Sequence, residues 1–323
     1  MDKTILITGA GGFLGRCFAS RLAAARPDLK IIAAERPAAP AWELPAGVEM
    51  IRFDVTEPIE IKAQPAVIFH IAGEKLDESR MDSVNRGGTA SLLAWARSAG
   101  VRRFIYLSSV GIYGATYNSG VITEASPAKP RNRYEQSKYE AENLVRSAGE
   151  SGGLETVILR PSNVFGRMDQ GELPLLNMIR MVRKGWFTYI GESATCFNYI
   201  AVEDVADALI AALQKEAGGR DYILNTPVLL RDAVYIIASE LGLPAPARTL
   251  PVWSGKLGGE IAAGLSALTG RNLPFNRERF RELTNTTCFD GTRITRELNF
   301  DYPTGVLPAL RELTRFYRVT GLL

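Results

Sequence analysis

Tyr134 and Lys138 are the two residues of this sequence whose types and spacing most directly suggest chemistry. Four residues apart on a helix, two side chains differ by roughly 400° and about 6 Å, so they project side by side from one face. A phenol titrates at about 10 and is a poor base at neutral pH unless a nearby ammonium favours the phenolate. The pair therefore suggests an acid–base couple, although Tyr-x-x-x-Lys also occurs on ordinary surface helices.

A glycine-rich turn, TGAGGFLG at residues 8–15, follows an apolar run and opens a helical pattern. Glycines permit a tight turn and let backbone N–H groups and the positive end of the helix approach a pyrophosphate. The strand–turn–helix context predicts a dinucleotide site. The alternative interpretation is a plain glycine turn.

Acidic residues at the ends of the next two strands suggest which dinucleotide binds. Glu35 lies 20 residues after Gly15 (35 − 15 = 20), where a carboxylate typically accepts from the adenosine ribose, and it favours NAD. Arg36 could instead pair with the 2′-phosphate of NADP, so NADP stays possible. Asp54 could accept from the adenine amino group or form a strand-end turn.

The elements that position these residues alternate along the first half of the chain. Short apolar runs predict buried strands at 4–8, 31–34, 48–53, 66–71, 102–107 and 155–160. Helical spacing of apolar residues predicts helices at 13–25, 83–99 and 133–148. Strands that alternate with helices predict the α/β class, a Rossmann-type doubly wound parallel sheet.

After about residue 165 the pattern changes to helices, such as 203–214, between Pro- and Gly-bearing loops. We expect a smaller, mostly helical substrate-binding lobe there. The predicted domains are a nucleotide-binding domain at 1–165, to which 197–225 contributes, and a lobe formed by 166–196 and 226–323. The apolar segment 252–269 could touch a membrane or an apolar substrate, or pack as a helix within the lobe.

Composition excludes several classes of protein. The 323 residues include 38 Lys+Arg and 35 Asp+Glu, a net charge of +3, so no strong field attracts nucleic acid or an anionic membrane. Hydrophobic residues at 46% and charged residues at 23% are typical of a globular protein. Charges interrupt every long apolar run, so no membrane span is expected.

Cysteine usage and the N-terminus suggest a compartment. Cys17, Cys196 and Cys288 are too scattered to predict a disulfide framework and have no metal-binding spacing, so a reducing cytosol fits best. The N-terminus has no signal-peptide pattern, and a cytoplasmic location and no metal are predicted. His70, the single histidine, is expected to be a core imidazole rather than a catalytic base.

Several motifs together resemble the extended branch of the short-chain dehydrogenase/reductase superfamily, the NAD-dependent epimerase/dehydratase family with its UDP-galactose 4-epimerase-like members. They are TGAGGFLG, VIFHIAG (67–73), the segment from VNRGG to SSVGIYG (84–114), YEQSK (134–138), LRPSNVFG (159–166), VEDVADAL (202–209) and RITRELNF (293–300). Their order along the chain matches the family.

The resemblance implies a catalytic triad. Ser109, five residues before Gly114, matches the family Ser/Thr that holds the substrate oxygen, with Ser108 as the neighbouring alternative. Tyr134 matches the residue that moves the proton. Lys138 matches the residue that binds the nicotinamide ribose and lowers the pKa of Tyr134.

The resemblance also implies binding residues. The cofactor set is Gly9, Gly12, Phe13, Leu14, Gly15, Glu35, Arg36, Asp54, Val55, Ala72, Gly73, Tyr134, Lys138 and Pro161. For the substrate, Ser109 is joined by Asn163, which matches an Asn that contacts sugar-nucleotide phosphates. Arg281, with Arg277 and Arg279, lies where a second phosphate-binding Arg often falls, or forms a solvated basic face. Phe197 stands where many members carry a diphosphate-binding Arg.

Departures from the family pattern select among its reactions. Family dehydratases place an Asp-Glu pair after the active Ser/Thr, and this chain has Val110-Gly111. The leading hypothesis is therefore an NAD(P)-dependent epimerase-like enzyme that acts on a nucleotide sugar by transient hydride transfer. The alternatives are an NAD(P)H-dependent ketoreductase or alcohol dehydrogenase, for a ketosugar, sterol-like or flavonoid-like ketone, and an NAD(P)-sensing regulator without turnover. Family members often form homodimers through the helices matching 83–99 and 133–148.

Overall fold

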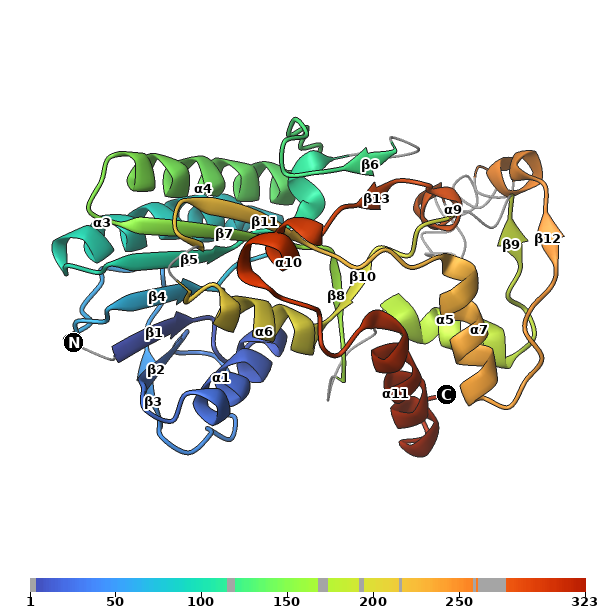
Figure 1. The fold of residues 1–323 in the computed structure, drawn as a ribbon, viewed down its shortest axis with the longest axis horizontal. Coiled ribbons are helices and arrows are strands. Elements are labelled where there is room, and N and C mark those ends of the chain that lie inside the picture. Colours follow the sequence, from blue (N-terminus) through green and yellow to red (C-terminus); the bar gives the residue numbers. More distant parts are fainter. Residues whose placement is uncertain are drawn as a thin grey trace.

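The computed structural model describes residues 4–114, 120–167, 174–191, 195–214, 217–257, 260 and 277–323. Its main strands are β1 (Thr4–Thr8), β2 (Lys30–Glu35), β3 (Val48–Arg52), β4 (Val67–His70), β5 (Arg103–Leu107), β7 (Glu155–Pro161) and β11 (Arg220–Leu224). They form one seven-stranded parallel sheet in the order β11-β7-β5-β4-β1-β2-β3 (Figure 1). This architecture confirms the predicted α/β, doubly wound fold.

Helices cover both faces of the sheet (Figure 1). One face carries α1 (Phe13–Ala25) and α6 (Val202–Ala211), and the other carries α3 (Thr89–Ser98) and α4 (Arg133–Glu150). Successive side chains of a strand point to opposite faces. Ile7 of β1 accordingly packs in the core that contains Phe18 of α1, whereas Leu6 packs in the core that contains Val145 of α4.

The prediction of one continuous helix over 83–99 is wrong in its first turns. The structure has α2 (Glu78–Met81), a π-helical turn η1 (Asp82–Gly88) and then α3. Gly88 permits the wide turn to pack on the loop after β3, because a Cβ there would lie 2.5 Å from Val55 Cγ2. The turn directs Asn85 to Ser137 Oγ (2.9 Å) and to both backbone groups of Glu74 (2.8 Å each). Asn85 therefore joins the loop after β4 to α4.

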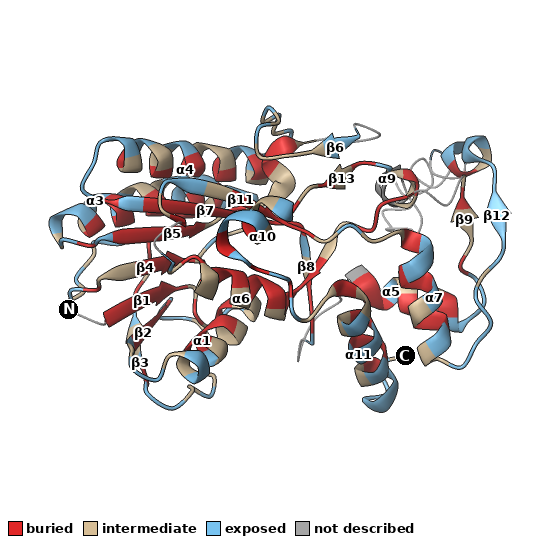
Figure 2. Ribbon diagram, viewed as in Figure 1, coloured by how far each residue is buried: buried red, intermediate tan, exposed pale blue. Residues whose placement is uncertain are grey.

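The second half of the chain builds a smaller lobe. Its helices are α5 (Pro174–Arg183), α7 (Leu230–Glu240), α9 (Arg277–Thr284) and α11 (Val306–Val319), and α10 (Thr292–Leu298) lies in the same half of the chain. Three parallel pairs of short strands accompany them: β8 (Asn163–Phe165) with β10 (Tyr199–Ala201), β9 (Tyr189–Ile190) with β12 (Thr249–Leu250), and β6 (Val121–Ile122) with β13 (Cys288–Phe289). Ile179, Ile237 and Leu310 share a separate core for α5, α7 and α11 (Figure 2).

Part of the second half returns to the central sheet. β11 is its outer strand, and α6 packs beside α1, which supports the proposal that 197–225 belongs with the nucleotide-binding domain. Ile294 of α10 shares the core of that domain with Tyr222 of β11. Within the described residues, no helix combines the length and apolar character needed to cross a bilayer.

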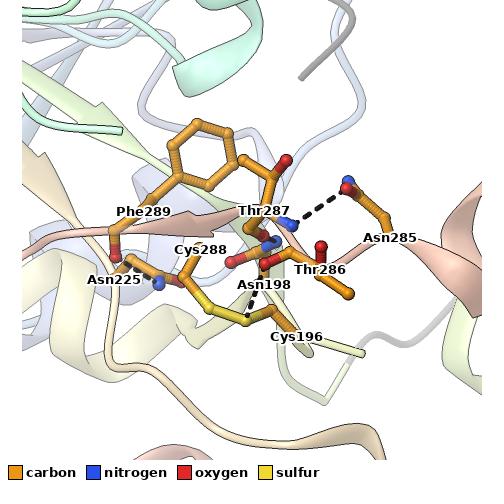
Figure 3. The surroundings of a disulfide bond; sticks show 8 residues. All are labelled: Cys196, Asn198, Asn225, Asn285, Thr286, Thr287, Cys288 and Phe289. Carbon is orange, nitrogen blue, oxygen red and sulfur yellow. Dashed lines mark hydrogen bonds between the residues drawn. A yellow bond between two sulfur atoms is a disulfide. The ribbon is translucent and has the colours of Figure 1, made fainter. Parts of the chain in front are cut away.

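Cys196 and Cys288 form a disulfide, so the prediction of scattered, unpaired cysteines is wrong for this pair (Figure 3). The residues are 92 positions apart in sequence, but their Cα atoms lie 5.7 Å apart. Long-range hydrogen bonds bring them together: Cys196 N donates to Asn285 O (3.0 Å), and Asn198 Nδ2 donates to Thr287 O (2.7 Å). The sequence argument for a reducing compartment therefore loses its basis.

Candidate functional site

The carboxyl ends of β1 and β4 define the centre of the candidate site. The strand order reverses between these neighbours, and open α/β sheets bind ligands at such a switch point. Gly9 (φ +71°) lies so close to the loop after β4 that a Cβ would be 2.7 Å from Ala72 Cα. A Cβ at Gly15 would lie 2.1 Å from Gly9 O, so glycine also permits α1 to begin directly on the turn.

The N-terminus of α1 is suited to bind a phosphate. Its N-cap, Gly12, is exposed and has no side chain that could accept a hydrogen bond from the first backbone N–H groups of the helix. Phe13 and Leu14 are the first residues that carry these N–H groups. No acidic residue lies in the first turn of this helix. Free N–H groups and the positive end of the helix dipole favour an anion there.

Glu35 lies against the glycine turn. Its carboxylate is buried, and a Cβ at Gly11 would lie 1.9 Å from Glu35 Oε1. Trp42 Nε1 donates to Glu35 Oε2 (2.9 Å) and fixes the carboxylate at the mouth of the turn. Sequence reasoning missed Trp42, because a loop residue seven positions later carries no pattern that predicts this contact. Arg36, by contrast, is exposed.

Asp54 and Val55 follow β3 and have structural contacts of their own. Asp54 Oδ1 accepts from Thr56 N (3.0 Å) and Thr56 Oγ1 (2.8 Å), the pattern of a strand-end turn. Burial raises the pKa of Asp54, but the Thr56 hydrogen bonds outweigh burial, so the pKa lies below its usual value. Val55 packs beneath Gly88 of the π-helical turn.

Ser109 and Tyr134 meet where β5 ends and α4 begins. Asn132 caps α4 by accepting from Glu135 N (2.9 Å), and Glu135 Oε2 accepts from Arg131 N (2.7 Å), which fixes the turn that carries Tyr134. The Ser109 hydroxyl lies close enough to Tyr134 to favour its phenolate form. Ser109 Oγ accepts from Gly111 N (3.0 Å), which leaves its hydroxyl proton available to a ligand or to Tyr134.

Lys138 is buried one turn along α4. Its Nζ donates to Leu107 O (2.7 Å) and lies 4.6 Å from the centre of the Tyr106 ring. A Cβ at Gly73 would lie 3.5 Å from this Nζ, so the loop after β4 passes close to the lysine at Gly73. Burial lowers the pKa of Lys138 to about 8, and the charge of Glu142 opposes that fall.

The expected lowering of the Tyr134 pKa is wrong for this structure. Burial raises the pKa of Tyr134, and the neighbouring Ser109 hydroxyl offsets only part of that rise. The Lys138 ammonium donates to Leu107 O rather than to the phenol.

A buried ion pair that sequence reasoning missed anchors α4 to β7. Arg160 Nε and Nη2 donate to Glu142 Oε1 (2.9 Å) and Oε2 (2.7 Å), while Arg160 Nη1 donates to Tyr113 OH (2.7 Å) and lies 2.8 Å from Asp221 Oδ2. Glu142 is one helical turn beyond Lys138. The pair thus fixes the helix immediately beside the lysine. Removing one partner of such a buried pair leaves an uncompensated charge and is strongly destabilising.

His70 is a core residue, as predicted. Its Nδ1 lies 2.7 Å from Thr8 Oγ1 and its Nε2 lies 3.0 Å from Thr89 Oγ1. Burial, followed by the charge of Lys138, lowers its pKa to about 3. Ser108 Oγ is buried with no hydrogen-bond partner within the described residues, so the contact with Tyr134 falls to its neighbour Ser109.

The predicted substrate residues are more dispersed. Pro161 is the buried last residue of β7, and Asn163 follows it on β8 with an exposed side chain, next to the β5 end that carries Ser109. Arg281 is exposed on α9, and no hydrogen bond or ion pair within the described ranges joins it to Asn163. The side chains of Arg277 and Arg279 lie outside the described residues.

Phe197, in place of a diphosphate-binding Arg, is buried and apolar. Its ring stacks on Tyr199 with centroids 4.4 Å apart. In the described part of the chain, no group of three His, Cys, Asp or Glu side chains could hold a metal ion.

Residues 5–225 match the NAD dependent epimerase/dehydratase family, and the chain therefore belongs to that family. The N-acetyl-alpha-D-glucosaminyl-diphospho-ditrans,octacis-undecaprenol 4-epimerase of Escherichia coli O157:H7 is 25% identical over 312 residues, 91% of this chain and 89% of that protein. The trifunctional UDP-glucose 4,6-dehydratase/UDP-4-keto-6-deoxy-D-glucose 3,5-epimerase/UDP-4-keto-L-rhamnose-reductase RHM1 of Arabidopsis thaliana is 31% identical over 247 residues, 69% of this chain but 37% of that protein.

A solved structure, MoeE5 in complex with UDP-glucuronic acid and NAD, shares the fold. It superposes with a TM-score of 0.72 at 20% identity and covers 98% of this chain and 99% of its own. Membership of this family confirms the resemblance that the sequence motifs indicated. It also confirms that the chain is expected to be an enzyme and that the cofactor of its family is NAD.

Proposed function

We propose that the chain is an NAD-dependent epimerase-like enzyme that acts on a nucleotide sugar. The observation that carries the proposal is the proximity of Ser109 and Tyr134, with buried Lys138 one turn away, beside the switch point of the sheet. A regulator that only senses the dinucleotide has no need for this set. Two relatives whose names include epimerase support the reaction class.

The residues present fit NAD. Gly9 and Gly15 allow the turn, the loop after β4 and α1 to pack closely, and exposed Gly12 leaves the N-terminus of α1 uncovered. The proposal assigns the pyrophosphate to that helix end. Buried Glu35, held by Trp42, would accept from the adenosine ribose diol. Gly73 and Lys138 then lie on the nicotinamide side. When bound, NAD supplies a carbon that accepts a hydride and can return it.

The chain's own residues would manage the proton. Ser109 would hold the reacting oxygen of the substrate, and Tyr134 would take the proton of that hydroxyl and later return it. Because burial raises the pKa of Tyr134, the phenol is protonated in the resting enzyme. It must release that proton to solvent before it can accept the hydroxyl proton, and it then returns the accepted proton to the carbonyl oxygen when the ketone is reduced. Lys138 would hold the nicotinamide ribose with its buried ammonium.

For the nucleotide sugar, we assign the phosphates to Asn163 and Arg281. Asn163 lies on β8, directly after the end of β7 and next to the β5 end that carries Ser109. Replacing Asn163 by alanine should raise the KM for a nucleotide sugar more than it lowers kcat, since a phosphate contact would stabilise the bound substrate and the transition state equally.

A ketoreductase is the second candidate, and Phe197 favours it. A buried ring stacked on Tyr199 binds no diphosphate, and an apolar ketone needs no cation at that position. The name of the Arabidopsis relative also includes a reductase of a ketosugar.

Product analysis separates the two candidates. The purified enzyme is incubated with UDP-glucose or UDP-N-acetylglucosamine and a catalytic amount of NAD, and the sugars are resolved by chromatography. An epimerase yields a stereoisomer with no lasting change in nicotinamide absorbance. Steady NADPH consumption with a ketone, and no epimer from either nucleotide sugar, would replace our proposal with the reductase.

We further propose a homodimer that associates through α3 and α4. Light scattering of the purified protein measures the molar mass in solution, which should be twice that of one chain. A monomer at micromolar concentration would contradict this assembly.

A further inference from the structure

Large apolar side chains are exposed at the outer edge of the smaller lobe, where β9 and β12 pair. Trp186 is 67% exposed, Trp253 is 69% exposed and Leu257 is 54% exposed, and Leu250 and Val252 lie between them in the chain. We call these five residues the lobe-edge patch. Figure 2 shows β12 exposed along its length at this end of the molecule. Apolar side chains that gather on a surface typically mark an interaction site.

Backbone pairing holds the patch together. Tyr189 N donates to Arg248 O (2.9 Å), and Gly191 N donates to Leu250 O (2.8 Å). Trp186 precedes one end of this ladder and Trp253 follows the other, so the two rings lie at opposite ends of the paired strands. Two anchors placed in this way fit an extended surface better than a single pocket.

The helical turn 252–257 is oriented by Gly255. A Cβ there would lie 2.6 Å from Ile190 Cγ2, so this side of the turn packs on the lobe. Trp253, Lys256 and Leu257 are exposed on its other sides. This part of the apolar segment 252–269 therefore packs on the lobe through Gly255, but the side chains of Trp253 and Leu257 stay exposed to solvent. The segment beyond 257 lies outside the described residues except for Glu260.

The charge beside the patch is positive. Segments 174–190 and 241–257 contain five Arg or Lys residues and no Asp or Glu, although the whole chain carries only +3. Lys184 Nζ lies 4.8 Å from the centre of the Trp186 ring. Arg180 binds Leu322 O, whereas no ion pair within the described part of the chain involves Lys184 or Lys256. Glu260 is the exposed acidic residue that follows the turn.

We propose that the lobe-edge patch binds the surface of a bilayer that contains anionic lipids. Tryptophan prefers the boundary between headgroups and acyl chains, and exposed Lys side chains are attracted to anionic headgroups. A symmetric contact with a second copy would place these cations against each other. The proposal goes beyond the proposed function and does not depend on it, because attachment needs neither substrate nor NAD.

Sedimentation with lipid vesicles tests the proposal on the full chain. Vesicles of phosphatidylcholine with one quarter phosphatidylglycerol are compared with pure phosphatidylcholine, at low and at high salt. We expect binding to the anionic vesicles that salt weakens. Lys184→Gln with Lys256→Gln should weaken binding about 30-fold, since each basic residue near an anionic surface contributes roughly fivefold. Trp186→Ser with Trp253→Ser should also weaken it.

Matched controls lie elsewhere on the surface. Val319→Ser and Lys62→Gln change one exposed apolar residue and one exposed lysine outside the patch, and they should leave binding unchanged. Binding by the patch variants equal to that of the wild type would overturn the proposal, as would no binding to anionic vesicles. A dimer in light scattering that Trp186→Ser with Trp253→Ser abolishes would overturn it in favour of a self-association face.

Discussion

Replacing Lys138 by methionine should affect the free energy of unfolding more favourably at neutral pH than at pH 10. An ammonium buried beside Leu107 O prefers to lose its proton, and burial lowers its pKa from 10.5 to about 8. At 1.36 kcal/mol for each tenfold change in protonation, that lowering corresponds to about 3 kcal/mol. The sign follows from the lowered pKa. Above pH 10.5 the lysine is neutral in both states and the free energy of unfolding is unaffected, and as the pH decreases from 10.5 to about 8 the free energy of unfolding decreases. Methionine has a similar shape and no charge, so it removes this cost.

Urea unfolding at pH 7 and pH 10 measures the effect. The remaining cost of the charge is about 3 kcal/mol at pH 7 and about 1 kcal/mol at pH 10, so the change in unfolding free energy caused by Lys138→Met should differ by about 2 kcal/mol between the two pH values. The hydrogen bond to Leu107 O, which methionine cannot make, is missing at both pH values, so its effect cancels. Lys62→Met, at an exposed lysine, should show no such difference. An equal effect of Lys138→Met at both pH values would refute the reasoning.

Three further predictions concern the proton carrier, the cofactor and the disulfide. Tyr134→Phe should lower turnover about 100-fold or more with NAD affinity and unfolding midpoint unchanged, and undiminished turnover in a steady-state assay would contradict its role. Glu35→Ala should narrow a preference for NAD over NADP in fluorescence titrations, whereas tighter NADP binding by the wild type would assign the ribose site to Arg36. Without reductant, thiol titration of the denatured chain should find only Cys17 of the three cysteines, and Cys196→Ser with Cys288→Ser should cost about 2 to 5 kcal/mol of unfolding free energy; three thiols before reduction would refute the pairing.

Local patterns in the sequence account for what could be predicted. The strands are continuous apolar runs because both faces of the sheet are covered, and the apolar period and the glycine turn predict α1 correctly. The spacing of Tyr134 and Lys138 places them on one helix face whatever the rest of the chain does. Glu35 is recognisable because it lies at a fixed distance from the glycine turn.

Features that depend on distant residues could not be predicted. The Cys196–Cys288 pair forms because segments 92 positions apart lie side by side, and no spacing rule contains that contact. The Arg160–Glu142 pair likewise joins a strand to a helix. The direction of the Tyr134 pKa shift is wrong in the sequence-based prediction, because sequence gives neither burial nor the direction in which the ammonium points.

Tracing the hydride tests the central claim most directly. UDP-glucose that carries deuterium on the carbon to be inverted is incubated with the enzyme and NAD well below the sugar concentration. The account predicts an epimer that retains deuterium at that carbon, with nicotinamide absorbance unchanged at the end of the reaction, because the hydride is returned. Deuterium that accumulates in reduced nicotinamide, or a sugar that is not inverted, would contradict it.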